Sequence, residues 1–239
     1  MKGSNRRRRS GRRGARVGPG GGAFHGARYA LEIAQHVERW LGPIEHVHCD
    51  RPLGRSPIDV LHVPPGAAND AHTFVTVGMS SRPMKAPREA ADCRLAELLL
   101  CLPAGWPVGN ALQGSPAHAW PLLELIELAR LPHAAGRWMW HGHSAADLLP
   151  IPFHPSTELC AWLVVCPIRL PPELHVLDLA SGERIWFFAA LPLYCEELEL
   201  KLDVGLDALV DRLRASRVTE RLDPRRPNVA LEPSIRRLQ

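Results

Sequence analysis

The feature that most constrains this chain is its division into short runs by proline and glycine. The 239 residues include 23 prolines and 19 glycines. Proline fixes one backbone angle and removes a hydrogen-bond donor, so it is confined mostly to turns, edges and helix ends. Pro64-Pro65-Gly66 is one such turn signal, and Gly42-Pro43 is another. We therefore expect short elements joined by rigid turns.

Residue patterns between these breaks predict both strands and helices. Runs rich in Val, Ile, Thr and Phe predict strands, and apolar residues at helical spacing predict helices. The expected strands are residues 45–49, 58–63, 73–79 and 161–165, with a hairpin of 175–179 and 184–189. The expected helices are residues 30–41, 120–130 and 206–213. Residues 94–102 fit either class, and Pro103 together with the preceding strands favours a buried strand.

The order of these elements predicts the fold class. Strands and helices do not alternate regularly, which argues against a doubly wound parallel sheet. An α+β domain with a mixed, largely antiparallel sheet and helices packed on it fits better. We expect this domain to span residues 23–217. Residues 218–239 are charged and interrupted by proline, which predicts a loosely attached C-terminal tail.

Charge is unevenly distributed along the chain. Residues 1–22 contain eight of the 29 basic residues and no acid, so residues 23–239 carry 21 basic and 25 acidic side chains, a net charge of −4. The Arg- and Gly-rich start has almost nothing to bury and predicts a disordered tail. It is either a solvated extension or a nucleic-acid-binding arm. The first reading is favoured because no aromatic residue is interleaved with the arginines for base stacking.

The cysteines and the hydropathy pattern indicate a cytoplasmic location. The six cysteines form no Cys-x-x-Cys pair, and four of them lie in apolar runs, which predicts reduced, structural thiols. No stretch approaches the roughly 18 consecutive apolar residues of a membrane span. The arginines at the start are not followed by the apolar core of an export signal.

Catalytic and metal-binding patterns are weak. His46-x-His48 and His141-x-His143 are the two tight histidine pairs, and residues two apart in a strand face the same side. Zinc needs three or four ligands, and neither pair has the helical spacing of a metalloprotease, so we predict no metal and no cofactor. A metal-dependent hydrolase built on both pairs remains an alternative. Ser80 lacks the following glycine of a nucleophile elbow because Arg82 stands there.

Two tryptophans are a better clue to function than the catalytic and metal-binding patterns. Trp138 and Trp140 lie on one side of an expected extended segment, directly before His141. Tryptophan is commonly a core residue, but it is also over-represented among the residues that anchor protein interfaces. The segment therefore indicates either part of the core or a contact surface for another protein.

The order of several segments resembles the suppressor of fused domain as it occurs in bacteria. A helix ending near Trp40 is followed by His46-Val47-His48, by Ile58-Asp59-Val60-Leu61 and by the telling stretch Thr73-Phe74-Val75-Thr76-Val77-Gly78-Met79-Ser80. The later segments include Arg94-Leu95-Ala96-Glu97-Leu98, Trp120-Pro121, Gly142-His143-Ser144, Pro192-Leu193-Tyr194 with Glu196-Glu197, and Gly205 with Leu209. Ser144 stands where the family pattern has threonine, a change that keeps the hydroxyl.

This resemblance covers roughly residues 24–215 and implies a non-enzymatic α+β binding domain. It implies that the partner is another protein. For a bacterial member, that partner is a toxin or effector encoded nearby, which an immunity-type protein binds and neutralises. Nucleic acid remains possible only through the N-terminal tail, and no membrane partner is expected. The candidate contact residues are Trp138, Trp140, His141, His143, Ser144, Glu196 and Glu197, whereas Thr76, Gly78 and Met79 are expected to support the fold.

Overall fold

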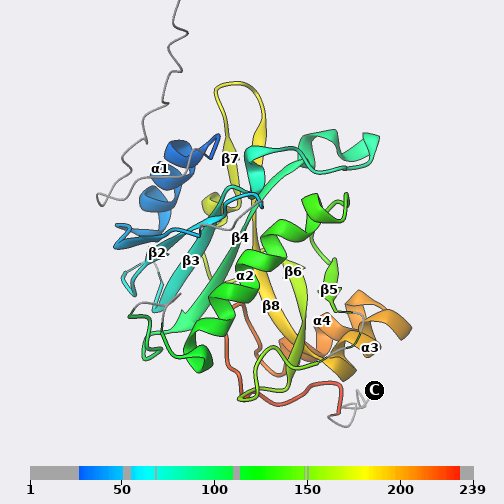
Figure 1. Cartoon of the computed structure of the whole chain (residues 1–239). Helices are drawn as coiled ribbons and strands as arrows, with labels where there is room; N and C mark the ends of the chain where they lie inside the picture. The colour runs from blue at the N-terminus through cyan, green and yellow to red at the C-terminus, as the bar shows by residue number, and fades with distance from the viewer. Residues whose placement is uncertain are drawn as a thin grey trace, which may run out of the picture.

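One mixed sheet organises the domain (Figure 1). The computed structural model describes residues 27–50, 55–67, 69–109, 114–147, 149 and 151–231. The expected tail at residues 1–22 and the end at 232–239 lie outside the described residues. The strands are β1 (His46–His48), β2 (Asp59–Val63), β3 (Ala71–Val77), β4 (Leu95–Pro103), β5 (Ser144–Ala146), β6 (Leu159–Val165), β7 (Val176–Asp178) and β8 (Arg184–Tyr194). The helices are α1 (Ala30–Leu41), α2 (Pro116–Ala134), α3 (Cys195–Asp203) and α4 (Leu206–Ala215).

The strand order is β1-β2-β3-β4-β8-β6-β5, and β7 also pairs with β8. Every pairing is antiparallel except that of β4 with β8. This confirms the predicted α+β class and the largely antiparallel mixed sheet. The ambiguous segment is the central strand β4, as Pro103 indicated. Helix α2 begins earlier and ends later than the predicted 120–130.

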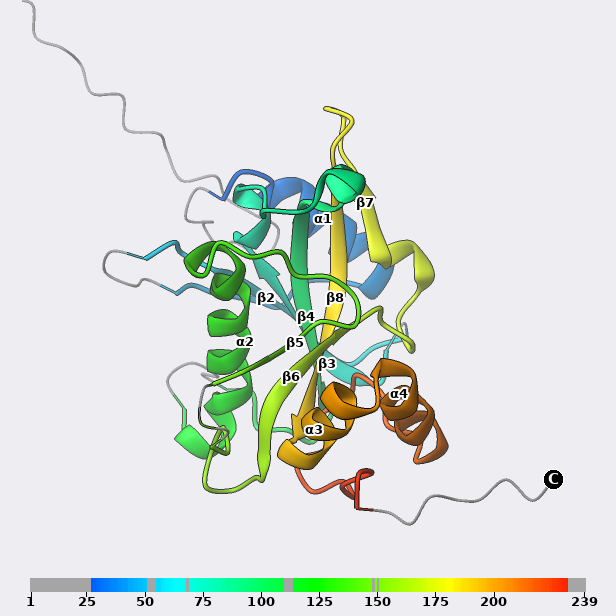
Figure 2. The same cartoon turned by 90° about the vertical axis from the view of Figure 1, so that its right-hand side faces the viewer.

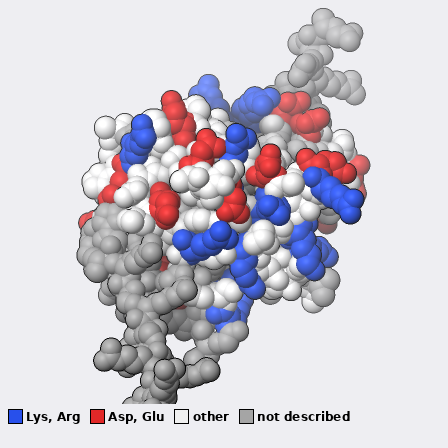
Figure 3. Space-filling view, turned by 90° about the horizontal axis from the view of Figure 1, so that it is seen from above, with Lys and Arg blue, Asp and Glu red and all other residues white. Residues whose placement is uncertain are grey.

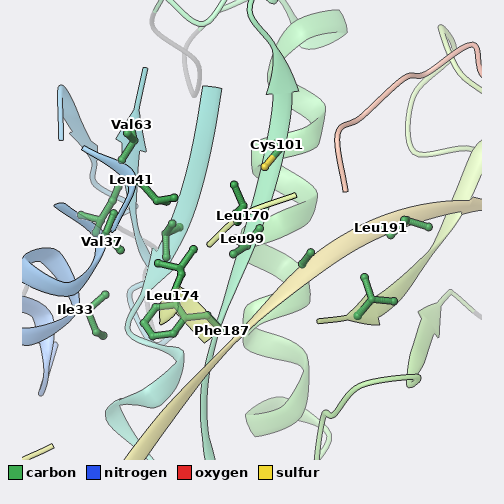
Figure 4. Packing of buried hydrophobic residues seen from close by; sticks show 14 of the residues in the cluster. Ile33, Val37, Leu41, Val63, Leu99, Cys101, Leu170, Leu174, Phe187 and Leu191 are labelled. Atoms are coloured by element: carbon green, nitrogen blue, oxygen red, sulfur yellow. The ribbon is translucent and has the colours of Figure 1, made fainter. Parts of the chain in front are cut away.

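Both faces of the sheet are covered. On one face, α1 packs on the sheet, and Ile33 and Val37 belong to the same buried cluster as Leu99 and Phe187 (Figure 4). On the other face, α2 and the segment around Met139 form a second core cluster. Successive residues of a strand point to opposite faces, so a strand buried on both sides has a continuous apolar run. Figure 2 shows α3 and α4 beside the lower ends of β6 and β8.

The stretch after β3 surrounds the buried carboxylate of Glu97 in β4. Glu97 Oε1 accepts hydrogen bonds from Gly78 N at 3.0 Å, Ser80 N at 2.9 Å and Ser80 Oγ at 2.6 Å. Glu97 Oε2 accepts one from Thr76 Oγ1 at 2.6 Å. Gly78 has φ +132°, and a Cβ there would lie 2.6 Å from Pro57 O, so no other residue fits. Thr76 and Gly78 therefore support the fold, and the fully buried Met79 contributes to the core.

Residues 218–231 are firmly attached, which corrects the expectation of a loose tail for this part of the chain. The side chain of Arg226 pairs with the fully buried Glu197, with Nη1 2.6 Å from Oε1. Tyr194 Oη donates to Arg226 O, and Val229 N donates to Glu197 Oε1 at 2.9 Å. Leu222 and Val229 are also buried. The charge and proline content of this segment predicted a solvated tail. The prediction failed because the sequence alone does not show that Arg226 has a buried partner.

Two of the cysteines differ from the prediction of reduced thiols. Cys160 in β6 and Cys195 at the start of α3 form a disulfide, with Cα atoms 5.9 Å apart. Their neighbours Leu159 and Tyr194 are directly paired across β6 and β8, so the strand register brings the two sulfurs together. Sequence spacing alone does not show this register. Cys93, Cys101 and Cys166 are not part of a disulfide.

Candidate functional site

An aromatic cluster formed by Trp138, Trp140, Trp186 and Phe188 lies on the α2 face of the sheet. Trp138 stacks on Trp140 with ring centres 5.6 Å apart, and Trp140 meets Trp186 edge-on at 4.9 Å. Phe188 lies beneath Trp140 and is fully buried. The three indole rings are only partly buried. The two predicted tryptophans are therefore neither entirely core nor entirely free; they form the outer layer of a packed cluster.

Hydrogen bonds fix the orientation of this cluster. Trp138 Nε1 donates to Cys93 O at 2.9 Å, and Trp186 Nε1 donates to Asp92 O at 3.3 Å. Both carbonyls belong to the short 3-10 helix η2 (Arg88–Cys93). The segment that carries Trp138 and Trp140 is fixed to β6, because Gly142 N donates to Val164 O at 2.7 Å. The rings are therefore held in defined positions before any partner binds.

The structure brings His141, His143 and Ser144 to the same segment. His141 is exposed, and its Nδ1 accepts a hydrogen bond from Cys166 N at 3.1 Å. His143 is also exposed and meets Trp138 edge-on, with ring centres 5.4 Å apart. Ser144 Oγ accepts a hydrogen bond from Lys201 Nζ at 3.0 Å. Burial lowers the pKa of this lysine. Of these polar side chains, His143 directly contacts an indole ring of the cluster.

The two glutamates predicted as contacts have different environments. Glu196 is exposed, and its Oε2 accepts a hydrogen bond from Asn228 Nδ2 at 2.8 Å. Glu197 is fully buried and bound to Arg226. A partner protein has no access to it without local unfolding. We therefore assign Glu197 to the fold and remove it from the proposed contact set.

Sequence reasoning missed Trp186 and Phe188. Both lie in β8, nearly fifty residues beyond Trp140, and the expected hairpin strand at 184–189 gave no sign of a shared cluster. A usable signal was present, because Trp186 and Phe188 are two apart in a strand and must face the same side. The sequence does not show, however, that β8 pairs with β6, and this pairing brings Trp186 and Phe188 next to Trp140.

The two histidine pairs lie far apart in the sheet order. His46 and His48 are in β1, at one edge, while His143 directly precedes β5, at the other edge. The hydrolase alternative, which needed all four on one metal, is therefore not supported. His46 and His48 are instead joined by His62 of β2 and His72 of β3. Burial, followed by the neighbouring His72, lowers the pKa of His62 to about 3, so its ring is neutral at neutral pH.

A family model described as suppressor of fused protein (SUFU) matches residues 54–227, which is more than half of the chain. This chain belongs to the suppressor of fused family. Proteins of this family are binding and regulatory proteins and not enzymes. The matched region includes the aromatic cluster, Arg226, and Glu97 with the stretch from Thr76 to Ser80 that surrounds it, which we call the Glu97 motif. No curated protein sequence matches the chain.

Solved structures show the same fold at low sequence identity. A suppressor of fused homologue from Neisseria gonorrhoeae has a TM-score of 0.59 and 14% identity over 87% of this chain and 100% of that chain. The crystal structure of the Sufu–Fu complex gives a TM-score of 0.57 and 14% identity over 82% of this chain and 90% of that chain. In the described part of this suppressor of fused chain, no helix has the length and apolar character needed to cross a bilayer.

Proposed function

We propose that this suppressor of fused domain binds another protein through the aromatic cluster and neutralises it, and that the partner is a toxin or effector. The observation that carries the proposal is the layer of three partly exposed indole rings with two of their N–H groups already bonded. Rigid, partly buried aromatic side chains are typical anchors of protein interfaces. Because these rings are held in place beforehand, binding loses little side-chain entropy.

The surroundings of the cluster fit the layout of a protein interface. His143 contacts Trp138, and exposed His141 and Ser144, with its partner Lys201, supply further polar groups on the segment that follows Trp140. An apolar centre with a polar rim is the usual arrangement. A stable interface typically buries about 1,600 Å² in total, so contacts must extend beyond the four rings. Glu196 remains a proposed contact at the edge of such a surface.

A toxin or effector is favoured as the partner for two reasons. Bacterial proteins that resemble this domain are expected to act as immunity proteins. In addition, the net charge of −4 over residues 23–239 suits a basic partner such as a nuclease. The charges are spread out, since acidic and basic side chains alternate over the face in Figure 3. Attraction through net charge is weak and screened by salt, so the aromatic cluster is proposed as the main source of affinity.

A pull-down against the products of neighbouring reading frames tests this function. We expect the full-length protein to capture one neighbour and to rescue cells from its toxicity. Trp138→Ala is expected to weaken binding about thirtyfold, as for a residue at the centre of an interface. Trp40→Ala is the matched control, because Trp40 is also partly buried but lies on α1. If Trp138→Ala and Trp40→Ala capture the partner equally well, the interface does not include the aromatic cluster.

The same pull-down distinguishes protein binding by the domain from the alternative function, nucleic-acid binding by the N-terminal tail. That function depends on the arginines of residues 1–22, which lie outside the described residues. A protein beginning at residue 23 is expected to retain full binding to its protein partner. If only the full-length chain captures anything, and nucleic acid is captured with it, the basic tail is the functional element and the proposed toxin neutralisation is wrong.

A further inference from the structure

Four histidines gather at the β1 end of the sheet, on the face that carries α2. In the β1–β2 pairing His46 lies opposite His62, and in the β2–β3 pairing His62 lies opposite Phe74. His48 and His72 are each two residues from these partners and so face the same side. The ring centres of His46, His48 and His62 form a nearly equilateral triangle with sides of 6.0 to 6.3 Å.

A chain of hydrogen bonds determines which nitrogen of His62 carries the proton. His72 Nε2 lies 3.2 Å from Ala104 O, a carbonyl that only accepts, so this nitrogen is the donor. In the tautomer of His72 that carries its proton on Nε2, Nδ1 is a lone pair, and it accepts from His62 Nε2 at 2.9 Å. In neutral His62 the proton is then on Nε2, and Nδ1 is a lone pair without a proton. A metal-binding histidine is typically held in this way through its other nitrogen.

Two of the imidazole nitrogens are buried and unpartnered. His62 is 1% exposed, and its Nδ1 has no hydrogen-bond partner. His48 Nε2 is likewise buried without a partner. Leaving a buried polar atom unpaired costs free energy, and a bound ion is one of the ordinary explanations. The carboxylate of Glu45 lies 3.8 Å from His62 Nδ1 and is exposed, as is His46, so the cluster is accessible from solvent.

We propose that His46, His48 and His62 bind a divalent transition-metal ion of the zinc class, with the Glu45 carboxylate as a fourth ligand. Three imidazole nitrogens and one carboxylate oxygen are a donor set that suits Zn²⁺. His72 is a positioning residue that orients His62 and does not touch the ion. Sequence reasoning noted His46 and His48 and found too few ligands, because it did not pair β1 with β2.

The cluster must contract to hold the ion. Among the described residues, no three side chains of the ligand-forming types already meet the geometry of a metal site. Three imidazoles on one tetrahedral zinc have ring centres about 5 Å apart, given zinc–nitrogen distances of about 2.0–2.1 Å. The rings here therefore need to approach by about 1 Å. Rotation of His46 and His48, on the edge strand β1, supplies such a movement without disturbing the central strands.

Zinc titration of the tag-free, full-length protein tests the proposal. After dialysis against a chelator, calorimetry with ZnCl₂ is expected to show one saturable site per chain. The double variant His46→Ala/His48→Ala is expected to lose it. The matched control is His141→Ala/His143→Ala, which removes two histidines at the same spacing from the other edge of the sheet. Loss of the site in the first variant and retention in the second would support the assignment.

A third variant tests the role of His72. His72→Leu leaves the three proposed ligands in place and breaks the chain that orients His62. We expect zinc affinity to fall by about tenfold to a hundredfold, as for other residues that support a metal ligand. Co²⁺ in place of Zn²⁺ gives a visible spectrum that reports four-coordinate binding, and this spectrum is expected in the wild type and in the control but not in His46→Ala/His48→Ala.

Two results would overturn the metal site. One is the failure of the wild type to bind zinc saturably. The other is equal binding by the wild type and by His46→Ala/His48→Ala, with both folded by circular dichroism. His46→Ala alone, at an exposed position, serves if the double variant does not fold. Neither result affects the proposed protein interface, because the aromatic cluster lies away from β1 and Trp138→Ala is expected to bind zinc normally.

Discussion

Glu97 and Glu197 are both fully buried, yet the fold stabilises them in different ways. Glu97 accepts four hydrogen bonds from uncharged donors, all within the stretch from Thr76 to Ser80. Glu197 is paired through two hydrogen bonds with the guanidinium of Arg226, 29 residues away, and also accepts from backbone amides. One carboxylate is surrounded by a local loop, and the other attaches a distant segment to the domain.

The difference indicates what each residue contributes. Because the donors around Glu97 carry no charge, neutralising this carboxyl leaves no unpaired ion behind. An ion pair is different, because removal of either partner leaves an uncompensated charge in the interior. The Glu97 motif therefore fixes the shape of a loop, while the Glu197 pair makes the attachment of residues 218–231 depend on charge.

Glu197→Gln is expected to have the largest effect. It leaves the guanidinium of Arg226 buried without its counter-ion, which costs about 3–5 kcal/mol of unfolding free energy. Urea denaturation followed by tryptophan fluorescence measures the loss. Adding Arg226→Met to the same chain removes the orphaned charge, so the double variant is expected to be more stable than Glu197→Gln alone. A double variant that is less stable would show that the pair acts through its hydrogen bonds and not its charge.

Thr76→Val is expected to have an intermediate effect at the Glu97 centre. The side chain keeps its shape, but the hydroxyl that donates to Glu97 and accepts from Leu98 N at 2.8 Å is lost. The two buried groups left unpaired cost about 1–3 kcal/mol. Thr73→Val in the same strand is the control. Its hydroxyl accepts from Asn69 Nδ2, which is only partly buried, so a smaller loss is expected.

Glu97→Gln is expected to have the smallest effect, about 1 kcal/mol at neutral pH, because the amide oxygen still accepts and its NH₂ group still reaches Thr76. Burial raises the pKa of Glu97 above its ordinary value, against the opposing effect of its hydrogen bonds. The folded state therefore holds this proton at pH values where the unfolded chain has lost it. This contribution to stability is full below about pH 4.3 and falls as pH rises through the raised pKa.

The pH dependence sharpens the same comparison. The stability advantage of the wild type over Glu97→Gln is expected to shrink as pH increases from 4 to 8. Denaturation midpoints of both proteins across this range give the difference directly. A constant difference, or one that grows with pH, would contradict a raised pKa for Glu97 and would make the two carboxylates more alike than their partners suggest.

Sequence patterns predicted the local features well and the long-range ones poorly. The strand at β4 and the hairpin of β7 and β8 follow from apolar runs and turn residues, which act over a few positions. The grouping of Trp138 with His143 follows from adjacency. The positions of Trp186 and of the proposed ligand His62 depend on which strands pair, and the partner of Glu197 depends on where the C-terminal segment packs. No pattern within a short window contains that information. Glu197 was misassigned because neither its burial nor its pairing with Arg226 can be seen in the sequence.

The 29-residue separation between Glu197 and Arg226 has a consequence during synthesis. A growing chain produces the carboxylate well before the guanidinium that neutralises it. Until Arg226 has left the ribosome, α3 has no stable place for Glu197 in the interior, and Val229 has not yet added its amide. The sheet strands that precede α3 are already available by then. We therefore expect vectorial folding in which the β-sheet forms first and α3 docks last, once Arg226 has been synthesised and can pair with Glu197.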